Sequence, residues 1–574
     1  MKLSPLEMLT SVLCASTVLA TNALLPNATH FVQPFPMPPC HGHALEDAGV
    51  AQIQRWYDSG ALTVRRVVQC YLDRISQVDS YIRAVMELNP DALAIADELD
   101  RELKAGKKRG PMHGIVVLVK DNFATADKMQ TTAGSLALVG SIVPRDAHVV
   151  SLMRKNGAVI LGHAGMSEWA DMRSTSYSEG YSARGGQVRN SYNLTQEPGG
   201  SSSGSGHAVT TNMVTVAYGT ETDGSVISPA ERANIVGIKP TVGLTSRAGI
   251  IPESVHQDTV GTFGRTVEDA AYALDAIFGF DYRDDATLEQ LGKTPENYVQ
   301  FVRNKSALKG MKVGIPWERL WTGLTTSRQI PALLEAVEIL KQHGVEVYNN
   351  TNYKFVDEIV SPNGWDWSFG ASPNQTELTV VQVDFYNNIK AYLSELSNTT
   401  IRSLEDIVAF NDETQNLSLE GGEPDIAAAF ASGQDGFLAS MATKGIENST
   451  YKQALSWCRR TSRIDGIDYA LNPVLPNGHT VHLDALLIPS DDNGPGTSIP
   501  AQAGYPIITV PVGFDEWHTP FGLSFVGTAF SEPILIKLTS AAQDALGAHR
   551  RVKPTFYQFN ATNIPVNWAI GTYL

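Results

Sequence analysis

The 574-residue sequence is poor in cysteine and in charged residues, and each shortage narrows the possible functions. Four cysteines are too few for a small scaffold built on disulfides. Only 18% of the residues are charged and 43% are apolar, so the chain can bury a large core and is not disordered. The length alone suggests three to four domains of about 150 residues, although single α/β enzymes can be this long.

Positive charge is scarce too: the sequence has 44 Lys and Arg residues but 60 Asp and Glu residues, which gives a net charge of −16. A nucleic-acid-binding protein displaces counterions with a basic face, and this sequence has no long Lys/Arg run. We therefore expect no nucleic-acid partner. H-E-x-x-H and paired C-x-x-C motifs are also missing, so we expect no metal site.

Long apolar runs are absent apart from one near the N-terminus. Lys2 precedes a mostly apolar stretch, residues 8–20, which is shorter than the ~20 residues that span a bilayer. It ends in small residues suited to cleavage, so we predict a secretory signal at residues 1–20 and a secreted protein. A short membrane anchor or a buried helix is the alternative. We expect no stable membrane insertion, and a Pro-rich leader follows at residues 21–43.

Secretion agrees with nine Asn-x-Ser/Thr sites, six of which fall between residues 304 and 448 and suggest an exposed, variable region. The sites are Asn27, Asn193, Asn304, Asn349, Asn374, Asn398, Asn416, Asn448 and Asn560. Cys14 would leave with the signal. Cys40, Cys70 and Cys458 can then form at most one intramolecular disulfide, and the sequence does not select the pair.

Apolar periodicity switches between strand and helix along the chain. Buried strands are predicted at 114–119, 158–162, 213–218, 235–238, 311–316, 345–348, 485–489, 507–512 and 523–526. Helices are predicted from Thr63, a good N-cap, and at 91–106, 147–156, 327–343 and 532–546. This alternation indicates an α/β sheet covered by helices. Residues 350–450 are the least regular part and suggest a helical insertion.

Three segments have the composition of a catalytic site, although each also has an ordinary structural interpretation. The Gly/Ser-rich run at 198–206 is either a flexible linker or a buried loop. The apolar segment that follows it favours the loop, whose N–H groups and hydroxyls would then lie close to other buried groups. The segment 219–225 is either a simple turn or a turn that presents Ser225 and backbone N–H groups as an oxyanion hole. Lys120 follows six apolar residues, so it either snorkels to the surface or is a desolvated base with a lowered pKa.

Together these segments resemble the amidase signature family. PGGSSSGSG (198–206) resembles the Gly/Ser-rich core of that family, GTETDGSVISPA (219–230) its nucleophile segment, and GPMHGIVVLVKDN (110–122) its lysine segment. The resemblance continues at 131–135, 157–170, 237–249, 503–514 and 522–527, and so covers roughly residues 45 to 556. It implies one large α/β domain at 44–574 with a mixed, mainly parallel β-sheet surrounded by α-helices.

The resemblance also implies roles for individual residues. Ser225 is the implied nucleophile, and Ser201, preceded by a cis peptide bond, relays its proton to a neutral Lys120. The N–H groups of Thr222, Asp223, Gly224 and Ser225 are the implied oxyanion hole, and Ala170 matches a substrate-contact position. The implied activity is hydrolysis of a small-molecule amide with no cofactor. The oligomeric state is not indicated.

The sequence departs from the family pattern at three positions near the nucleophile. Asp223 and Ser203 stand where the family commonly has Gly, and Ile227 stands where it often has Arg. The proton relay survives these changes, but Asp223 adds a carboxyl group near the site. We therefore predict that acidic substrates are poorly tolerated.

Other functions remain open at this point. Gly200 to Gly204 fits G-x-S-x-G, which would make Ser202 the nucleophile of a serine esterase, but that motif needs a preceding strand and a His base. A secreted binding protein without activity is a second alternative. A tRNA-linked amidotransferase component is a third, opposed by the acidic charge and the signal.

His163 and His207 are expected to be structural. Asp121 and Asn122 are expected to position the Lys120 loop.

Overall fold

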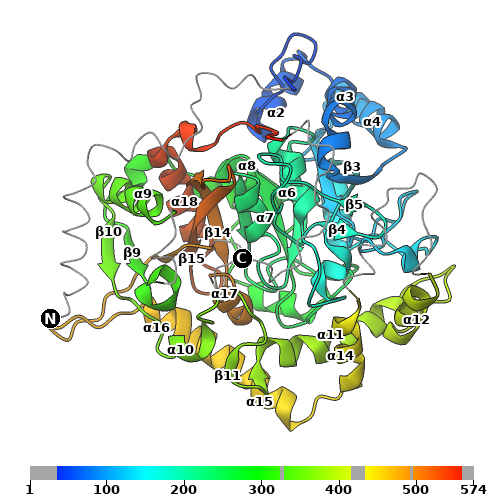
Figure 1. Cartoon of the computed structure of the whole chain (residues 1–574). Coiled ribbons are helices and arrows are strands. Elements are labelled where there is room, and N and C mark those ends of the chain that lie inside the picture. The colour runs from blue at the N-terminus through cyan, green and yellow to red at the C-terminus, as the bar shows by residue number, and fades with distance from the viewer. Residues whose placement is uncertain (1–34, 323–328, 415–432, 491–495, 559–574) are drawn as a thin grey trace.

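An eleven-stranded sheet runs through the molecule (Figure 1), in a computed structural model that describes residues 35–322, 329–414, 433–490 and 496–558. In spatial order its strands are β1 (Val85–Leu88), β3 (Val159–Ala164), β2 (Val116–Lys120), β6 (Val216–Glu221), β8 (Thr259–Gly264), β7 (Val236–Lys239), β14 (Ile507–Phe514), β15 (Pro520–Val526), β13 (Ala485–Ile488), β9 (Lys312–Ile315) and β10 (Glu346–Asn349). Most are buried along their whole length, as the continuous apolar runs predict. The signal predicted at 1–20 lies outside the described residues.

The sheet is mixed, which confirms the expected α/β class. Parallel pairing links β3, β2 and β6 on one side and β13, β9 and β10 on the other. The strands between these groups pair antiparallel, as do β1 and β3. Antiparallel pairing is thus more extensive than "mainly parallel" implied. The reason is local for β14 and β15, because only residues 515–519 connect them, too few for the crossover that parallel strands need.

Helices cover the sheet and follow the predicted apolar periodicity. Those foreseen from sequence are α3 (Val64–Ile82), α4 (Ala92–Lys104), α5 (His148–Lys155), α9 (Ile330–Gln342) and α18 (Glu532–Leu546). Thr63 caps α3 by accepting from the Arg66 N–H, as expected of an N-cap threonine. Others include α2 (Val50–Asp58), α7 (Ile227–Arg232), α8 (Val267–Asp275), which packs on β8, and α17 (Ser498–Ala503).

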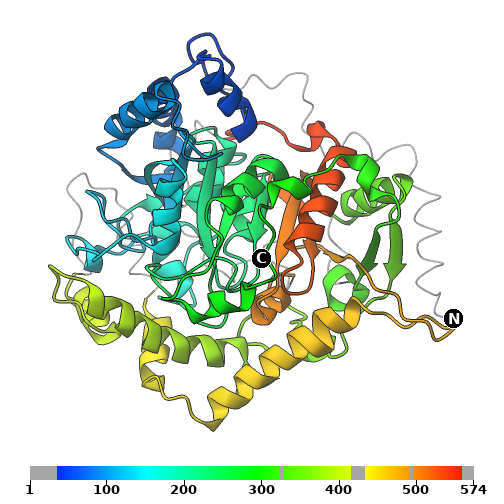
Figure 2. The ribbon, with the colours of Figure 1, turned by 180° about the vertical axis from the view of Figure 1, so that it is seen from behind.

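Four helices form a belt along the lower side of the molecule in Figures 1 and 2. They are α11 (Glu377–Glu395), α12 (Leu404–Thr414), α14 (Asp435–Thr443) and α15 (Ser449–Arg459). α11 packs against α14 and α15. Val381 and Phe385 of α11 share a buried apolar cluster with Trp169, so the belt reaches the segment that follows β3.

Among the elements that were not foreseen in the sequence, β1, β8 and α6 (Ser203–Thr210) each have a local reason. β1 and β8 contain Glu or several Gly and Thr residues, which lack the pattern of a buried strand. The third is α6, where a buried loop was expected over the whole Gly/Ser-rich run. This part of the prediction was wrong. Gly and Ser are weak helix formers, but every residue of α6 is buried, and tertiary packing outweighs propensity there.

One disulfide ties the first described segment to α3. It joins Cys40 to Cys70, whereas Cys458 is buried and free. This resolves the pairing that the sequence left open. None of the helices among the described residues is both long and apolar enough to cross a membrane.

Candidate active site

Lys120 is the last residue of β2, and its side chain is fully buried. Its Nζ lies 2.7 Å from Ser201 Oγ, 3.0 Å from Thr220 Oγ1 and 3.3 Å from Thr220 O. Burial lowers the pKa of Lys120 to about 8, and the surrounding carboxyl groups of Glu253, Asp171, Glu179 and Asp258 oppose this shift. Desolvation therefore favours a neutral amine at the end of the strand.

Two serines extend the chain of hydrogen bonds from this amine. Ser201 Oγ lies 2.9 Å from Ser225 Oγ. The peptide bond between Gly200 and Ser201 is cis, as the resemblance implied. Ser225 follows the turn that ends β6, the parallel neighbour of β2, so Lys120 and Ser225 belong to adjacent strand ends. The structure thus brings together Lys120, Ser201 and Ser225.

Glycines let the Gly/Ser-rich segment pass close to its neighbours. A Cβ on Gly200 would collide with Glu179 Oε2, and one on Gly204 would collide with the carbonyl oxygen of Ala84. Ser202 lies beside Ser201, but its hydroxyl donates to the carbonyl of Thr220 at 3.1 Å. No strand directly precedes it, so the strand that the esterase motif requires is missing at this place in the described chain.

The turn from Thr222 to Ser225 presents its backbone N–H groups without using them. Within the described residues, none of these four N–H groups donates to a protein acceptor. The two N–H groups that follow, of Val226 and Ile227, both donate to Glu221 Oε2, at 2.7 and 2.9 Å. The turn contains Gly224 at φ +83°, a conformation that favours glycine.

Residues that the sequence did not single out support this turn. Gln257 Nε2 donates to the carbonyl of Thr222 at 3.2 Å and to Glu377 Oε1 at 2.6 Å. Trp365 Nε1 donates to Asp223 Oδ2 at 2.6 Å. Trp365 and Glu377 lie in the irregular part of the chain, where no local pattern marks them as partners of a distant turn.

The remaining predicted residues lie around this centre. Ala170 is buried in the segment Glu168–Asp171 at φ 51° and belongs to an apolar cluster, and its N–H donates to the carbonyl of Ser167 at 3.0 Å rather than to a group of the relay. Asn122 Nδ2 donates to Thr220 Oγ1 at 3.0 Å, the same oxygen that Lys120 reaches. Asn122 therefore positions the acceptor of the lysine.

Asp121 and the two histidines make structural contacts. Asp121 accepts from the Gly134 N–H and lies 2.8 Å from His163 Nδ1, so it orders the loop after Lys120. His207 Nδ1 lies 3.0 Å from Ser191 Oγ, and its Nε2 lies 2.9 Å from the carbonyl oxygen of Pro198. Burial lowers the pKa of His207 to about 4, so the ring is neutral. In the described part of the chain, no group of three His, Cys, Asp or Glu side chains is arranged to hold a metal ion.

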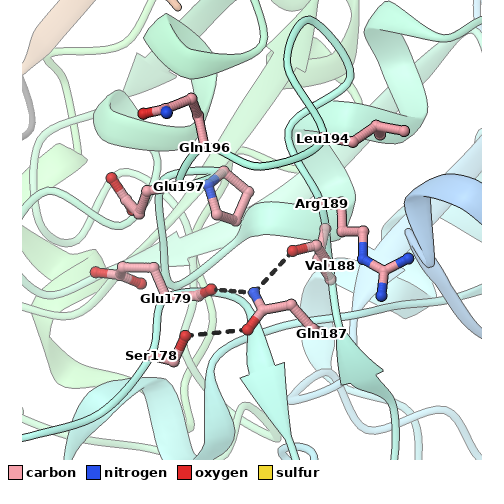
Figure 3. A pocket seen from close by; sticks show the side chains of 9 residues that line it. Ser178, Glu179, Gln187, Val188, Arg189, Leu194, Gln196 and Glu197 are labelled. Carbon is pink, nitrogen blue, oxygen red and sulfur yellow. Dashed lines mark hydrogen bonds between the residues drawn. The ribbon is translucent and has the colours of Figure 1, made fainter. Parts of the chain in front are cut away.

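A small cleft lies beside Pro198, the first residue of the Gly/Ser-rich run (Figure 3). In it the Gln187 side chain accepts from Ser178 Oγ at 3.0 Å and donates to the carbonyl oxygens of Glu179 and Val188. The space is about the size of one water molecule, too small for an amide substrate. It is therefore a packing feature around Glu179 rather than the substrate site.

Comparisons with known proteins show which family the chain belongs to. A family model described as Amidase matches residues 66–536. A Schizosaccharomyces pombe protein named as an amidase is 53% identical over 96% of this chain and 94% of its own length. The solved peptide amidase of Stenotrophomonas maltophilia superposes with a TM-score of 0.78 at 38% identity, covering 90% of this chain and 99% of that chain. A component of the glutamyl-tRNA(Gln) amidotransferase of Alkaliphilus metalliredigens is 29% identical over 88% of this chain and 98% of its own.

Proposed function

The chain belongs to the amidase family and is an amide hydrolase, and we propose that it acts through an acyl-enzyme on Ser225 with a proton relay through Ser201 to Lys120. The observation that carries this proposal is the continuous path from Ser225 Oγ to Ser201 Oγ at 2.9 Å and on to Lys120 Nζ at 2.7 Å. Both distances are those of hydrogen bonds that can pass a proton.

Acylation begins when Ser225 Oγ attacks the amide carbonyl carbon. The Ser225 proton moves to Ser201, whose own proton moves to the neutral amine of Lys120. The lowered pKa of Lys120 supports this direction of transfer, because a substantial fraction of the amine is neutral near pH 8. Thr220 accepts from the same amine and so helps turn its lone pair toward Ser201.

The tetrahedral intermediate carries a negative charge on the former carbonyl oxygen. The N–H groups of Thr222, Asp223, Gly224 and Ser225 support an oxyanion hole here, since no protein acceptor among the described residues competes for them. Ser201 then gives a proton to the departing nitrogen. Water hydrolyses the acyl-enzyme by the reverse proton path, and the carboxylic acid leaves.

The test compares Ser225→Ala with Ser202→Ala in amide hydrolysis. We expect Ser225→Ala to reduce kcat at least 10³-fold, roughly the effect of removing a covalent nucleophile. Ser202→Ala is the matched variant, one residue from the relay, and should fold and retain far more activity. A larger loss in Ser202→Ala than in Ser225→Ala would overturn the assignment and favour the Ser202 esterase.

For the substrate we propose a neutral carboxamide of peptide character. The similarity to a peptide amidase supports this class, and the carboxyl of Asp223 beside the turn disfavours a substrate with a nearby negative charge. The test compares an N-blocked dipeptide amide with a simple aliphatic amide of similar size. A higher kcat/KM for the dipeptide amide supports the class, and a preference for the aliphatic amide contradicts it.

We also propose that the protein is secreted, with a signal at 1–20, a leader at 21–43 and the catalytic domain at 44–574. Support comes from the N-terminal pattern and from the Cys40–Cys70 disulfide, which suits an oxidising compartment. Five of the predicted glycosylation sites are exposed: Asn304, Asn349, Asn374, Asn398 and Asn448. Asn193 is buried and donates to the Trp517 carbonyl, so it is the internal control. Glycan mapping should find the exposed sites modified and Asn193 bare, whereas unmodified protein from the secretory pathway would contradict the proposal.

A further inference from the structure

The turn that presents Ser225 is held from behind by a second carboxyl group. Asp223 stands in this turn and Glu377 is the first residue of α11, the helix of the belt that carries it to the active site. Glu377 is fully buried. The two side chains lie within hydrogen-bonding reach of each other.

Among the described residues, no Lys or Arg forms an ion pair with Asp223 or Glu377, and their polar partners are the Trp365 indole N–H and the amides of Gln257 and Gln502. Trp365 donates to Asp223 Oδ2. The other oxygen, Oδ1, is buried, and no donor among the described residues meets the geometry of a hydrogen bond to it. The hydroxyls of Thr497 and Ser498 lie nearby.

Two dehydrated carboxyl groups in contact cannot both be ionised without a large repulsion, as in the carboxyl pairs of acid proteases. The proton-bearing carboxyl group then donates to the other, beside the hydroxyls of Thr497 and Ser498, which also lie within hydrogen-bonding reach of Asp223. Burial raises the pKa of both groups. Asp223 raises the pKa of Glu377 further, whereas the hydrogen bond with Glu377 lowers the pKa of Asp223, so Glu377 is the group that keeps the proton. Of the other titratable groups around them, Lys239 and Glu221 lie near Asp223, and Cys458 lies near Glu377.

We propose that Glu377 is a positioning residue that, as a neutral acid, donates to Asp223 and thereby fixes the oxyanion turn. Its other contacts support the same role. Gln257 donates to both Glu377 and the Thr222 carbonyl, so Glu377 is linked to the turn at two successive residues, Thr222 and Asp223. The side-chain amide of Gln502, in α17, also donates to Glu377 Oε2 at 3.1 Å. The inference rests on the proposed oxyanion hole.

Infrared difference spectroscopy tests the protonation state without reference to activity. We expect the spectrum of the wild-type protein minus that of Glu377→Gln at pH 7 to contain the carbonyl band of a protonated carboxylic acid. Glu395→Gln, at the other end of α11 in an exposed pair with Arg145, is the matched control and should show none. A difference spectrum that contains only ionised carboxylate bands for Glu377 overturns the proposal.

Kinetics test the positioning role. Glu377→Ala removes the donor to Asp223, and we expect kcat to fall about 10- to 100-fold with KM nearly unchanged, a loss on the scale of a misplaced oxyanion donor. Glu377→Gln keeps a donor and should recover most of that loss. Equal kcat in the two variants, or a change confined to KM, overturns the proposal. If Glu377→Ala does not fold, the infrared difference spectrum of Glu377→Gln still shows whether Glu377 is protonated. Failure of the Ser225 assignment would appear separately, in Ser225→Ala.

Discussion

The pH dependence of amide hydrolysis follows from the burial of Lys120, because the amine must be neutral to accept the relayed proton. Its pKa falls from 10.5 to about 8. At pH 7 about one molecule in ten then carries the neutral amine, compared with about one in 3,000 for an ordinary lysine. The buried position thus increases the reactive fraction about 300-fold.

The direction follows from the acid–base role of Lys120. A base with a pKa near 8 is protonated below that pH, so kcat/KM should fall about tenfold for each pH unit below 8 and level off above it. The assay is hydrolysis of an uncharged amide between pH 5 and 9.5 at constant ionic strength, since the pH profile of kcat/KM reports the free enzyme. Lys120→Arg is the matched variant, because arginine keeps its proton and should lower kcat/KM at least 100-fold at every pH. A flat profile between pH 6 and 9, or a fully active Lys120→Arg, would refute the role of Lys120 as the base.

Further predictions concern the lysine's acceptor, the disulfide and the turn. Thr220→Val removes the oxygen that accepts from both Lys120 and Asn122, so kcat should fall about tenfold with little change in KM, consistent with the loss of the hydrogen bond that positions the Lys120 amine. An unchanged kcat would contradict this. Replacing both Cys40 and Cys70 by Ser opens a loop with a sequence separation of 30 and should lower the free energy of unfolding, measured in urea, by about 3 to 4 kcal/mol. As a control, the wild-type protein should lose the same stability only when a reductant is added. Matched neutral and anionic amides should differ in kcat/KM by at least about tenfold, or roughly 1.4 kcal/mol, and Asp223→Asn should narrow the gap; equal turnover by the wild-type enzyme contradicts the prediction.

The sequence predicted the parts of the site whose signals are local. The apolar run that ends in Lys120 is a buried strand, β2, because six consecutive apolar residues suit only the middle of a covered sheet. The turn at Ser225 follows β6 directly, as the strand-then-turn pattern indicated. The cis bond before Ser201 came from the family resemblance alone, since nothing in the local residue pattern predicts it.

The parts that escaped prediction depend on contacts between distant segments. Glu377 and Trp365 reach Asp223 from more than 140 positions along the chain, and no periodicity marks such partners. β8 was missed because its Gly and Thr residues weaken the strand pattern, although it is buried along its whole length and pairs with β6 and β7 along its two edges. α6 was missed because packing, rather than helix propensity, makes the Ser- and Gly-rich segment helical.

Covalent labelling is the most direct test of whether Ser225 is the nucleophile. A fluorophosphonate reacts with an activated serine, and peptide mapping of the labelled protein then identifies that serine, with Ser225→Ala as the control. We expect one label on Ser225 in the wild-type protein and none in Ser225→Ala. A label on Ser202 that persists in Ser225→Ala would contradict it.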